Sequence, residues 1–125
     1  MKAYLAGPMS GHPHMNIPAF HREAARLRAL GWDIVSPVEL DHGDGGRGDR
    51  APQHYLRNDI RALLDCEALI IMPGWSASVG ARCELAIAIT LGLPIYELPN
   101  LIQPYMRVLI DEGYVSEASR AVATP

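Results

Sequence analysis

The chain has few cysteines and no long hydrophobic run, and both absences restrict what it can be. Cys66 and Cys83 are the only thiols in 125 residues, too few for a disulfide framework and without the paired spacing of a zinc site. A reduced compartment fits best, so we expect a cytoplasmic location. No apolar stretch reaches the ~18 residues of a transmembrane helix, and the short apolar start ending at Gly7-Pro8 is not a secretory signal. We expect a soluble protein that does not bind membranes.

Basic charge is scarce as well. The chain has 11 Lys and Arg against 14 Asp and Glu, a net charge of -3 at pH 7. Proteins that bind nucleic acids normally present a basic face, so a nucleic acid polymer is not an expected partner. The five histidines are scattered, without the spacing of a metal site, and we predict neither a metal nor any other cofactor. Backbone N–H groups and helix ends would have to hold an anionic ligand.

The order of apolar segments predicts the fold. The length suits one core, so residues 1–125 are expected to form a single domain. Short apolar strands alternate with helical patterns, the strands being expected at 4–5, 32–35, 68–72 and 94–98. The alternation predicts an α/β fold with an open, doubly wound, mostly parallel sheet of four to five strands flanked by helices, Rossmann-like or flavodoxin-like. Ligands bind such sheets outside the carboxyl ends of the strands, where the loops 7–11 and 73–80 are expected.

Three further segments complete the predicted organisation. Residues 41–53 contain four glycines among charged residues and are expected to form a mobile loop, because they bury too little apolar surface to become ordered. Residues 100–111 have a helical pattern of apolar positions, whereas 117–125 lose the pattern and are expected to be a disordered tail.

The loop after the first strand is the first candidate binding element. It consists of Gly7, Pro8, Met9, Ser10 and Gly11, and the missing Cβ atoms of its glycines would let backbone N–H groups approach an anion or a sugar edge. An ordinary tight turn fixed by the proline is the alternative.

Two carboxylates are candidate reactive groups. In the string from Ser78 to Glu84, a serine and Gly80 stand at the mouth of a helix and the glutamate lies in its first turns. A helix N-terminus offers N–H donors to a phosphate and favours an ionised carboxylate. The alternative is that Glu84 complements the helix dipole from the surface. Asn58-Asp59 is expected ahead of the helix that leads into the central strand at 68–72, where Asp59 can also serve as a simple cap.

These side chains suit one type of chemistry. A carboxylate nucleophile, a second carboxyl group and a tyrosine on a neighbouring strand are parts needed to cleave an acetal-like bond. The string from Tyr4 to Gly11, the stretch 58–67 and Ser78-x-Gly80-x-x-x-Glu84 resemble the nucleoside 2-deoxyribosyltransferase superfamily. The last motif is most similar to the branch that acts on 2′-deoxynucleoside 5′-monophosphates as an N-glycosidase.

The resemblance implies a role for each motif. Glu84 would be the nucleophile, Asp59 the second acidic residue near the sugar and base, and Tyr4 the group that orients Glu84. The 5′-phosphate would be held by two residues of the helix mouth and by the backbone of the first loop, namely Ser78, Gly80, Gly7, Met9, Ser10 and Gly11. Pro8 departs from the family pattern, because the monophosphate enzymes usually have a serine there.

The expected activity is hydrolysis of the N-glycosidic bond of a (deoxy)nucleoside 5′-monophosphate through a glycosyl-Glu84 intermediate, releasing free base and sugar 5-phosphate. Base exchange by a nucleoside 2-deoxyribosyltransferase is one alternative, and a non-catalytic nucleotide-binding sensor is another. The base, any modification of it, and ribose versus 2′-deoxyribose stay open. Apolar residues on more than one side of the helix at 84–91, together with those of 100–114, predict a homodimer or higher homo-oligomer.

Overall fold

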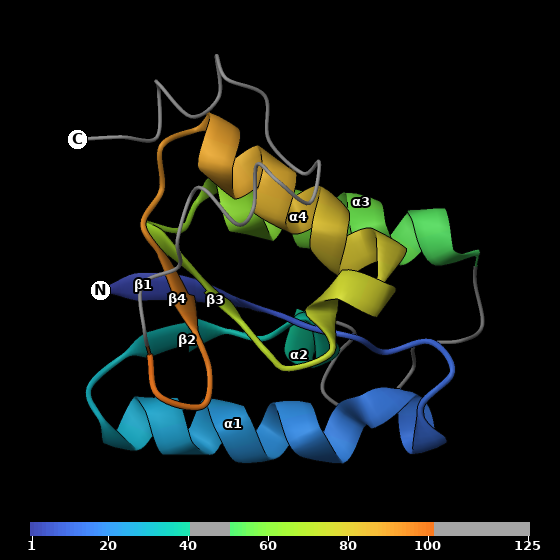
Figure 1. The fold of residues 1–125 in the computed structure, drawn as a ribbon, viewed down its shortest axis with the longest axis horizontal. Helices are drawn as coiled ribbons and strands as arrows, with labels where there is room; N and C mark the ends of the chain where they lie inside the picture. The colour runs from blue at the N-terminus through green and yellow to red at the C-terminus, as the bar shows by residue number, and fades with distance from the viewer. Residues whose placement is uncertain (41–50, 102–125) are drawn as a thin grey trace.

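Four short parallel strands form the sheet at the centre of the protein (Figure 1). The computed structural model describes residues 1–40 and 51–101. The strands are β1 (Lys2–Ala6), β2 (Asp33–Val35), β3 (Ala68–Ile71) and β4 (Ile95–Glu97). Their order across the sheet is β2-β1-β3-β4. The α/β fold with an open parallel sheet, predicted from the alternation of segments, is confirmed.

Helices cover both faces of the sheet. The longer ones are α1 (Ile17–Ala29), α3 (Pro52–Leu64) and α4 (Val79–Thr90); η1 (Pro13–Asn16), α2 (Pro37–Leu40) and η2 (Trp75–Ala77) are short. Figure 1 shows α1 on one face and α3 with α4 on the other. From β1 the chain first crosses to β2 at one edge of the sheet, and from β2 it moves across the sheet in the opposite direction, to β3 and then β4. Because such crossover connections are right-handed, the helices of the two directions lie on opposite faces. None of the helices in residues 1–40 and 51–101 is long and apolar enough to cross a membrane.

The core has two halves, one on each face of the sheet. Tyr4 and Leu69, which are register partners on β1 and β3, face the side of α3 and α4. Their neighbours Leu5 and Ile70 face the side of α1. All four residues of β3 are buried, as expected for a central parallel strand covered on both faces. The reversal of strand order between β1 and β3 is the topological switch point, where such sheets bind ligands.

Several boundaries differ from those expected. The helix α3 begins at Pro52, a suitable first residue because proline lacks the N–H that a first turn leaves unpaired. Asp59 therefore lies inside this helix, and its expected position ahead of the helix was wrong. Residues 75–77 form η2 and α4 already begins at Val79. Most of the loop expected at 41–53, the tail at 117–125 and most of the helix expected at 100–111 lie outside the described residues.

The carboxyl ends of β1 and β3 approach each other closely. The N–H of Met72 donates to the carbonyl of Ala6 at 2.8 Å. A Cβ atom built on Gly7 would lie 2.9 Å from the Cβ of Met72 and 3.0 Å from its Sδ. Real Cβ atoms do not come this close, so the residue after β1 must be glycine unless the strand ends move apart.

The substitution Gly7→Ala is expected to lower the free energy of unfolding by about 1–3 kcal/mol, because the added methyl group overpacks this junction. Gly80→Ala is the matched control. A Cβ atom there would meet Leu56 Cδ1 at an ordinary 3.6 Å, and alanine is the better helix former. Urea denaturation of both variants measures the difference; equal stability would contradict the close approach at Gly7.

Candidate active site

Two carboxyl side chains lie in the interior of the protein. Asp59 and Glu84 are each only 4% exposed, and apart from tyrosines and cysteines Ser36 is the only other buried residue with a polar side chain in the described parts of the chain. Aspartate and glutamate are rarely buried to this degree, because removing an ionised carboxylate from water costs several kcal/mol. Glu84 therefore does not complement its helix dipole from the surface, and Asp59 is not a solvent-exposed cap. Retaining two such groups is typical of functional sites.

Helical spacing turns both carboxyl groups inward. In α4, Glu84 lies three residues after Ala81 and four before Ala88, within a buried stripe that also contains Leu85. In α3, the buried residues Tyr55, Asp59 and Leu63 follow each other at intervals of four. Each carboxyl group thus belongs to the side of its helix that packs into the protein.

Tyr4 faces the same part of the interior. It is fully buried on the sheet face covered by α3 and α4, in one cluster with Leu63 and Leu85. Asp59 is one helical turn before the first of these leucines, and Glu84 directly precedes the second. The structure therefore brings the three predicted catalytic residues, from β1, α3 and α4, to one layer between the sheet and the helix pair. Their catalytic roles remain predictions.

The loops after β1 and β3 meet beside this layer. A Cβ atom on Gly74, whose φ is 86°, would lie 3.2 Å from the Cγ of Pro8, so the two loops touch. The second loop continues to Ser78, whose Oγ accepts a hydrogen bond from the N–H of Ala81 at 3.1 Å and caps α4. A Cβ atom on Gly80 would face Leu56 of α3. The mouth of α4 therefore lies next to α3.

The predicted phosphate-binding residues differ in exposure. Gly7 is buried, Ser10 and Gly11 are exposed, and Ser78 and Gly80 are half-buried. Met9 is 8% exposed and its side chain belongs to the core on the α1 side. Met9 can therefore offer a ligand only its backbone, as the resemblance implied.

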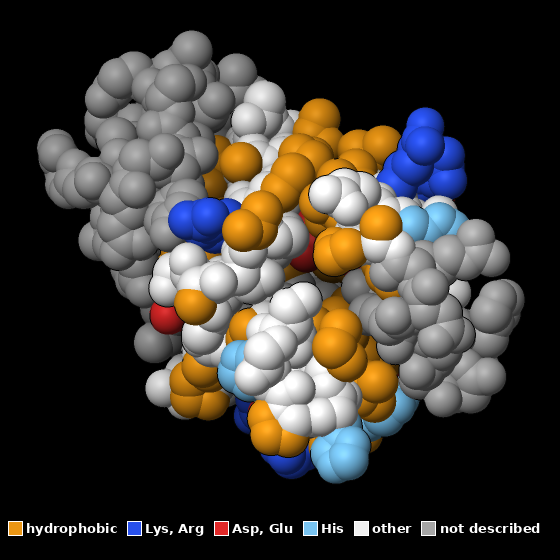
Figure 2. Space-filling view, turned by 90° about the vertical axis from the view of Figure 1, so that its right-hand side faces the viewer, with side chains coloured by type: hydrophobic (Ala, Val, Ile, Leu, Met, Phe, Trp, Pro, Cys, Tyr) orange, Lys and Arg blue, Asp and Glu red, His pale blue; other side chains and the backbone are white. Residues whose placement is uncertain are grey.

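Figure 2 views the molecule from the side toward which the strands run. A small area of acidic side chain is visible near the centre of this face, surrounded by hydrophobic side chains and white atoms, whereas the histidines lie farther away, in the lower and right-hand parts of the view. In the described residues, no group of three or more His, Cys, Asp and Glu side chains is arranged to hold a metal ion.

Ser36, at the carboxyl end of β2, was not singled out by its sequence context. It is 1% exposed, and among the described residues its Oγ has no hydrogen-bond partner. An unpaired buried hydroxyl is unfavourable. Only the tertiary structure reveals this buried hydroxyl, because a serine followed by a proline in the sequence predicts no more than the end of a strand.

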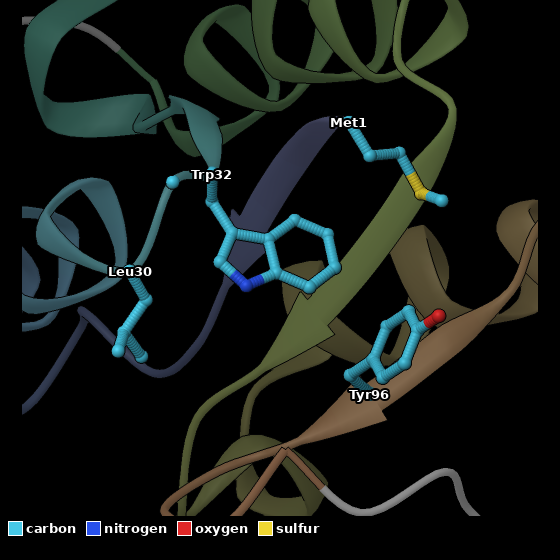
Figure 3. A pocket seen from close by; sticks show the side chains of 5 residues that line it. Met1, Leu30, Trp32 and Tyr96 are labelled. Atoms are coloured by element: carbon cyan, nitrogen blue, oxygen red, sulfur yellow. The ribbon is translucent and has the colours of Figure 1, made fainter.

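A hollow of about 300 Å³ lies elsewhere in the protein (Figure 3). Its lining includes Met1, Leu30, Trp32 and Tyr96, and the two aromatic rings meet edge to face with centroids 5.3 Å apart. Both rings pack on the α1 side of the sheet. The hollow is therefore separated from Asp59, Glu84 and Tyr4 by the sheet and contributes none of their chemistry.

The chain belongs to a family described as a domain of unknown function (DUF4406), whose model matches residues 1–97. No curated protein sequence matches it. A solved structure with a similar fold is the 2-deoxyribosyltransferase of the psychrotolerant bacterium Bacillus psychrosaccharolyticus. That structure matches with a TM-score of 0.58 and 17% sequence identity, over 100% of this chain and 92% of the other. The fold implied by the resemblance is thus confirmed.

The two thiols are not activated. Burial raises the pKa of Cys66 to about 11, and its Sγ lies 3.4 Å from the carbonyl oxygen of Ala62, to which it donates. Burial also raises the pKa of Cys83, and the neighbouring Glu84 carboxylate adds to this shift. A raised pKa lowers the fraction of thiolate, the nucleophilic form, at neutral pH.

Alkylation by iodoacetamide at pH 8 should therefore be slow in the native protein. For Cys66, whose pKa lies at about 11 against an ordinary 9.0, the thiolate population and the rate should fall about 100-fold relative to the urea-unfolded chain. Cys83 should also react more slowly than in the unfolded chain. Mass spectrometry of each cysteine peptide measures both rates, and rapid native labelling of Cys83 would indicate an activated thiol instead.

Proposed function

We propose that the protein is an N-glycosidase that hydrolyses the N-glycosidic bond of a (deoxy)nucleoside 5′-monophosphate, with Glu84 as the nucleophile. The observation that carries this proposal is the burial of two carboxyl side chains on the inward sides of neighbouring helices, on the sheet face where Tyr4 is also buried. A pair of carboxyl groups is the usual equipment for cleaving a glycosidic bond through an oxocarbenium-like transition state.

Each residue has a distinct task in this reaction. A carboxylate oxygen of Glu84 attacks the anomeric carbon while the bond to the base breaks, which gives a glycosyl ester and the departing base. Water then attacks the same carbon: its hydroxyl group stays on the sugar, Asp59 takes up the remaining proton, and Glu84 is released as a carboxylate. Asp59 contacts sugar and base and moves the proton that the leaving base needs. Tyr4 orients Glu84 from β1.

The 5′-phosphate is assigned to the helix mouth and the first loop. Ser78 and Gly80 are half-buried at the start of α4, where N–H groups without helical partners favour an anion. The backbone of Gly7, Met9, Ser10 and Gly11 completes this side of the site. Since the loops after β1 and β3 touch at Pro8 and Gly74, both sets of donors can serve one ligand.

Base exchange is the second candidate function. The protein of similar fold is named a 2-deoxyribosyltransferase and is described as a biocatalyst for the synthesis of nucleosides. In that reaction a second base replaces water at the glycosyl ester, so the same residues serve both outcomes. Product analysis with and without an acceptor base separates them.

The test is the release of free base from a panel of nucleosides and nucleoside 5′-monophosphates, followed by chromatography. Monophosphates should be cleaved with the higher kcat/KM. Glu84→Gln should lower kcat by about 1,000-fold or more while substrate binding persists, because the amide keeps the shape but loses the nucleophilic charge. Asp59→Asn should also lower activity and alter one limb of the pH-rate profile.

Circular dichroism and thermal unfolding of both variants control for misfolding. A Glu84→Gln variant with near wild-type rates would refute Glu84 as the nucleophile, and tight nucleotide binding without turnover by the wild-type protein would favour the sensor. Equal efficiency on nucleosides and monophosphates would contradict the phosphate site.

We also propose a homodimer that pairs through α4. Apart from Arg82 and the buried Glu84, this helix has no charged residue, and Val79 and Leu91 are 70% and 52% exposed. A helix with apolar residues on most sides is normally buried, so we expect the outer side of α4 to be covered by a second copy of the chain, as its inner side is covered by the sheet.

Sedimentation should show a dimer. Leu91→Lys, just after the end of α4, should weaken it, whereas Leu30→Lys, at the end of α1 on the opposite sheet face, should leave it intact. A monomeric wild-type protein at assay concentration would rule the dimer out.

A further inference from the structure

A strained turn follows the first binding loop. His14, Met15 and Asn16 have φ angles of 52°, 55° and 60°, so three successive residues other than glycine adopt the left-handed conformation. For L-residues this conformation costs roughly 1–2 kcal/mol each, least for asparagine. Such strain persists only where the surrounding structure holds it, and it is concentrated at functional sites. The turn begins three residues after Gly11, close to the loop at the carboxyl end of β1.

The side chain of Asn16 ties this turn back to the loop. Its Nδ2 donates a hydrogen bond of 2.8 Å to the carbonyl oxygen of Pro8. Between them, the N–H of His12 donates to the carbonyl of Met9 at 3.2 Å, and the N–H of Met15 donates to the carbonyl of His12 at 3.1 Å. The loop and the strained turn therefore form one hydrogen-bonded unit, to which Asn16 contributes a side-chain bond.

Pro8 is held from a second direction by the loop after β3. Its ring lies against Gly74, where a Cβ atom would come within 3.2 Å of Cγ. With the ring fixed on one side and the carbonyl bound by Asn16, the peptide between Pro8 and Met9 has one orientation. A planar trans peptide points its N–H opposite to its C=O. Binding the Pro8 carbonyl therefore also determines the direction of the Met9 N–H, which points away from Asn16.

We propose that Asn16 is a positioning residue for substrate binding: its amide holds the Pro8–Met9 peptide so that the Met9 N–H is presented to the sugar-phosphate part of the nucleotide. This inference rests on the proposed function, which assigns the loop to that part of the substrate. Asparagine meets both demands at this position. It tolerates the left-handed backbone better than other residues with a side chain, and it supplies the N–H donor that the Pro8 carbonyl accepts.

Two variants separate the hydrogen bond from the backbone conformation. Asn16→Gly adopts the left-handed backbone conformation without steric strain but lacks the side-chain amide that donates to the Pro8 carbonyl. Asn16→Asp keeps the shape, tolerates the same conformation, and at neutral pH offers only acceptor oxygens to the Pro8 carbonyl. Both should raise KM for the monophosphate about five- to tenfold, the effect of one lost hydrogen bond, with kcat changed less than twofold. His14→Gly relieves strain without touching the bond and should leave KM unchanged.

Acidification provides a rescue that a purely structural role would not show. Once the carboxyl group of the Asn16→Asp variant is protonated, its O–H can donate to the Pro8 carbonyl. The KM of this variant, divided by that of the wild type at each pH, should fall toward one as the pH decreases. The ratio for Asn16→Gly should stay constant. A parallel loss of kcat and thermal stability with no KM effect, or equal pH dependence of both ratios, would overturn the proposal.

Hydrogen exchange without any ligand separates a failure of this inference from a failure of the proposed function. The amides of Met9 and Ser10 should exchange faster in Asn16→Gly and Asn16→Asp than in the wild type or His14→Gly. If exchange accelerates but the wild type cleaves no nucleotide, the proposed function fails and the positioning of the peptide by Asn16 stands. Unchanged exchange in both Asn16 variants refutes the positioning itself, whatever the activity of the wild type.

Discussion

The burial of Asp59 and Glu84 is the constraint on which the rest of the site depends. Two carboxyl groups removed from water must be matched by polar surroundings or by a ligand, because each costs several kcal/mol otherwise. The helices nevertheless turn both groups inward, on the stripes that pack against the sheet. The neighbours of Glu84 on the buried side of α4 include the small residues Ala81 and Ala88. The packing of α3 and α4 thus serves the placement of two acids as well as the burial of apolar surface.

A second constraint operates at the carboxyl edge of the sheet, where two loops must approach without side chains between them. Gly7 lies against Met72, and Gly74 lies against Pro8. The bond from Asn16 to the Pro8 carbonyl adds a third contact from the strained turn. These contacts join the two central strands, the loop after each, and the start of α1 into one connected frame beside the buried acids. A frame of this kind suits a site that must hold a substrate in a fixed position.

The fold by itself does not decide among hydrolysis, base exchange and binding, because one fold supports many activities. The decision depends on what the buried acids contact and on how well water is excluded from a glycosyl intermediate. The aromatic hollow at Trp32 and Tyr96 shows the contrast. It is open and contains two aromatic rings, but it lies on the other side of the sheet and its lining lacks a carboxyl group. The two buried carboxyl side chains of the described residues belong instead to the helices α3 and α4, which cover the opposite face.

The sequence by itself determined the architecture, since alternating apolar strands and helices can pair only as a parallel sheet with helices on its faces. It also located the loop after β1 and the mouth of α4, because glycine and a capping serine act locally. Only the tertiary structure decided that Asp59 lies inside α3, that Glu84 is buried, and that Asn16 reaches Pro8. Burial depends on which side of a helix meets the sheet, and the Asn16 bond depends on a left-handed turn that no local propensity predicts.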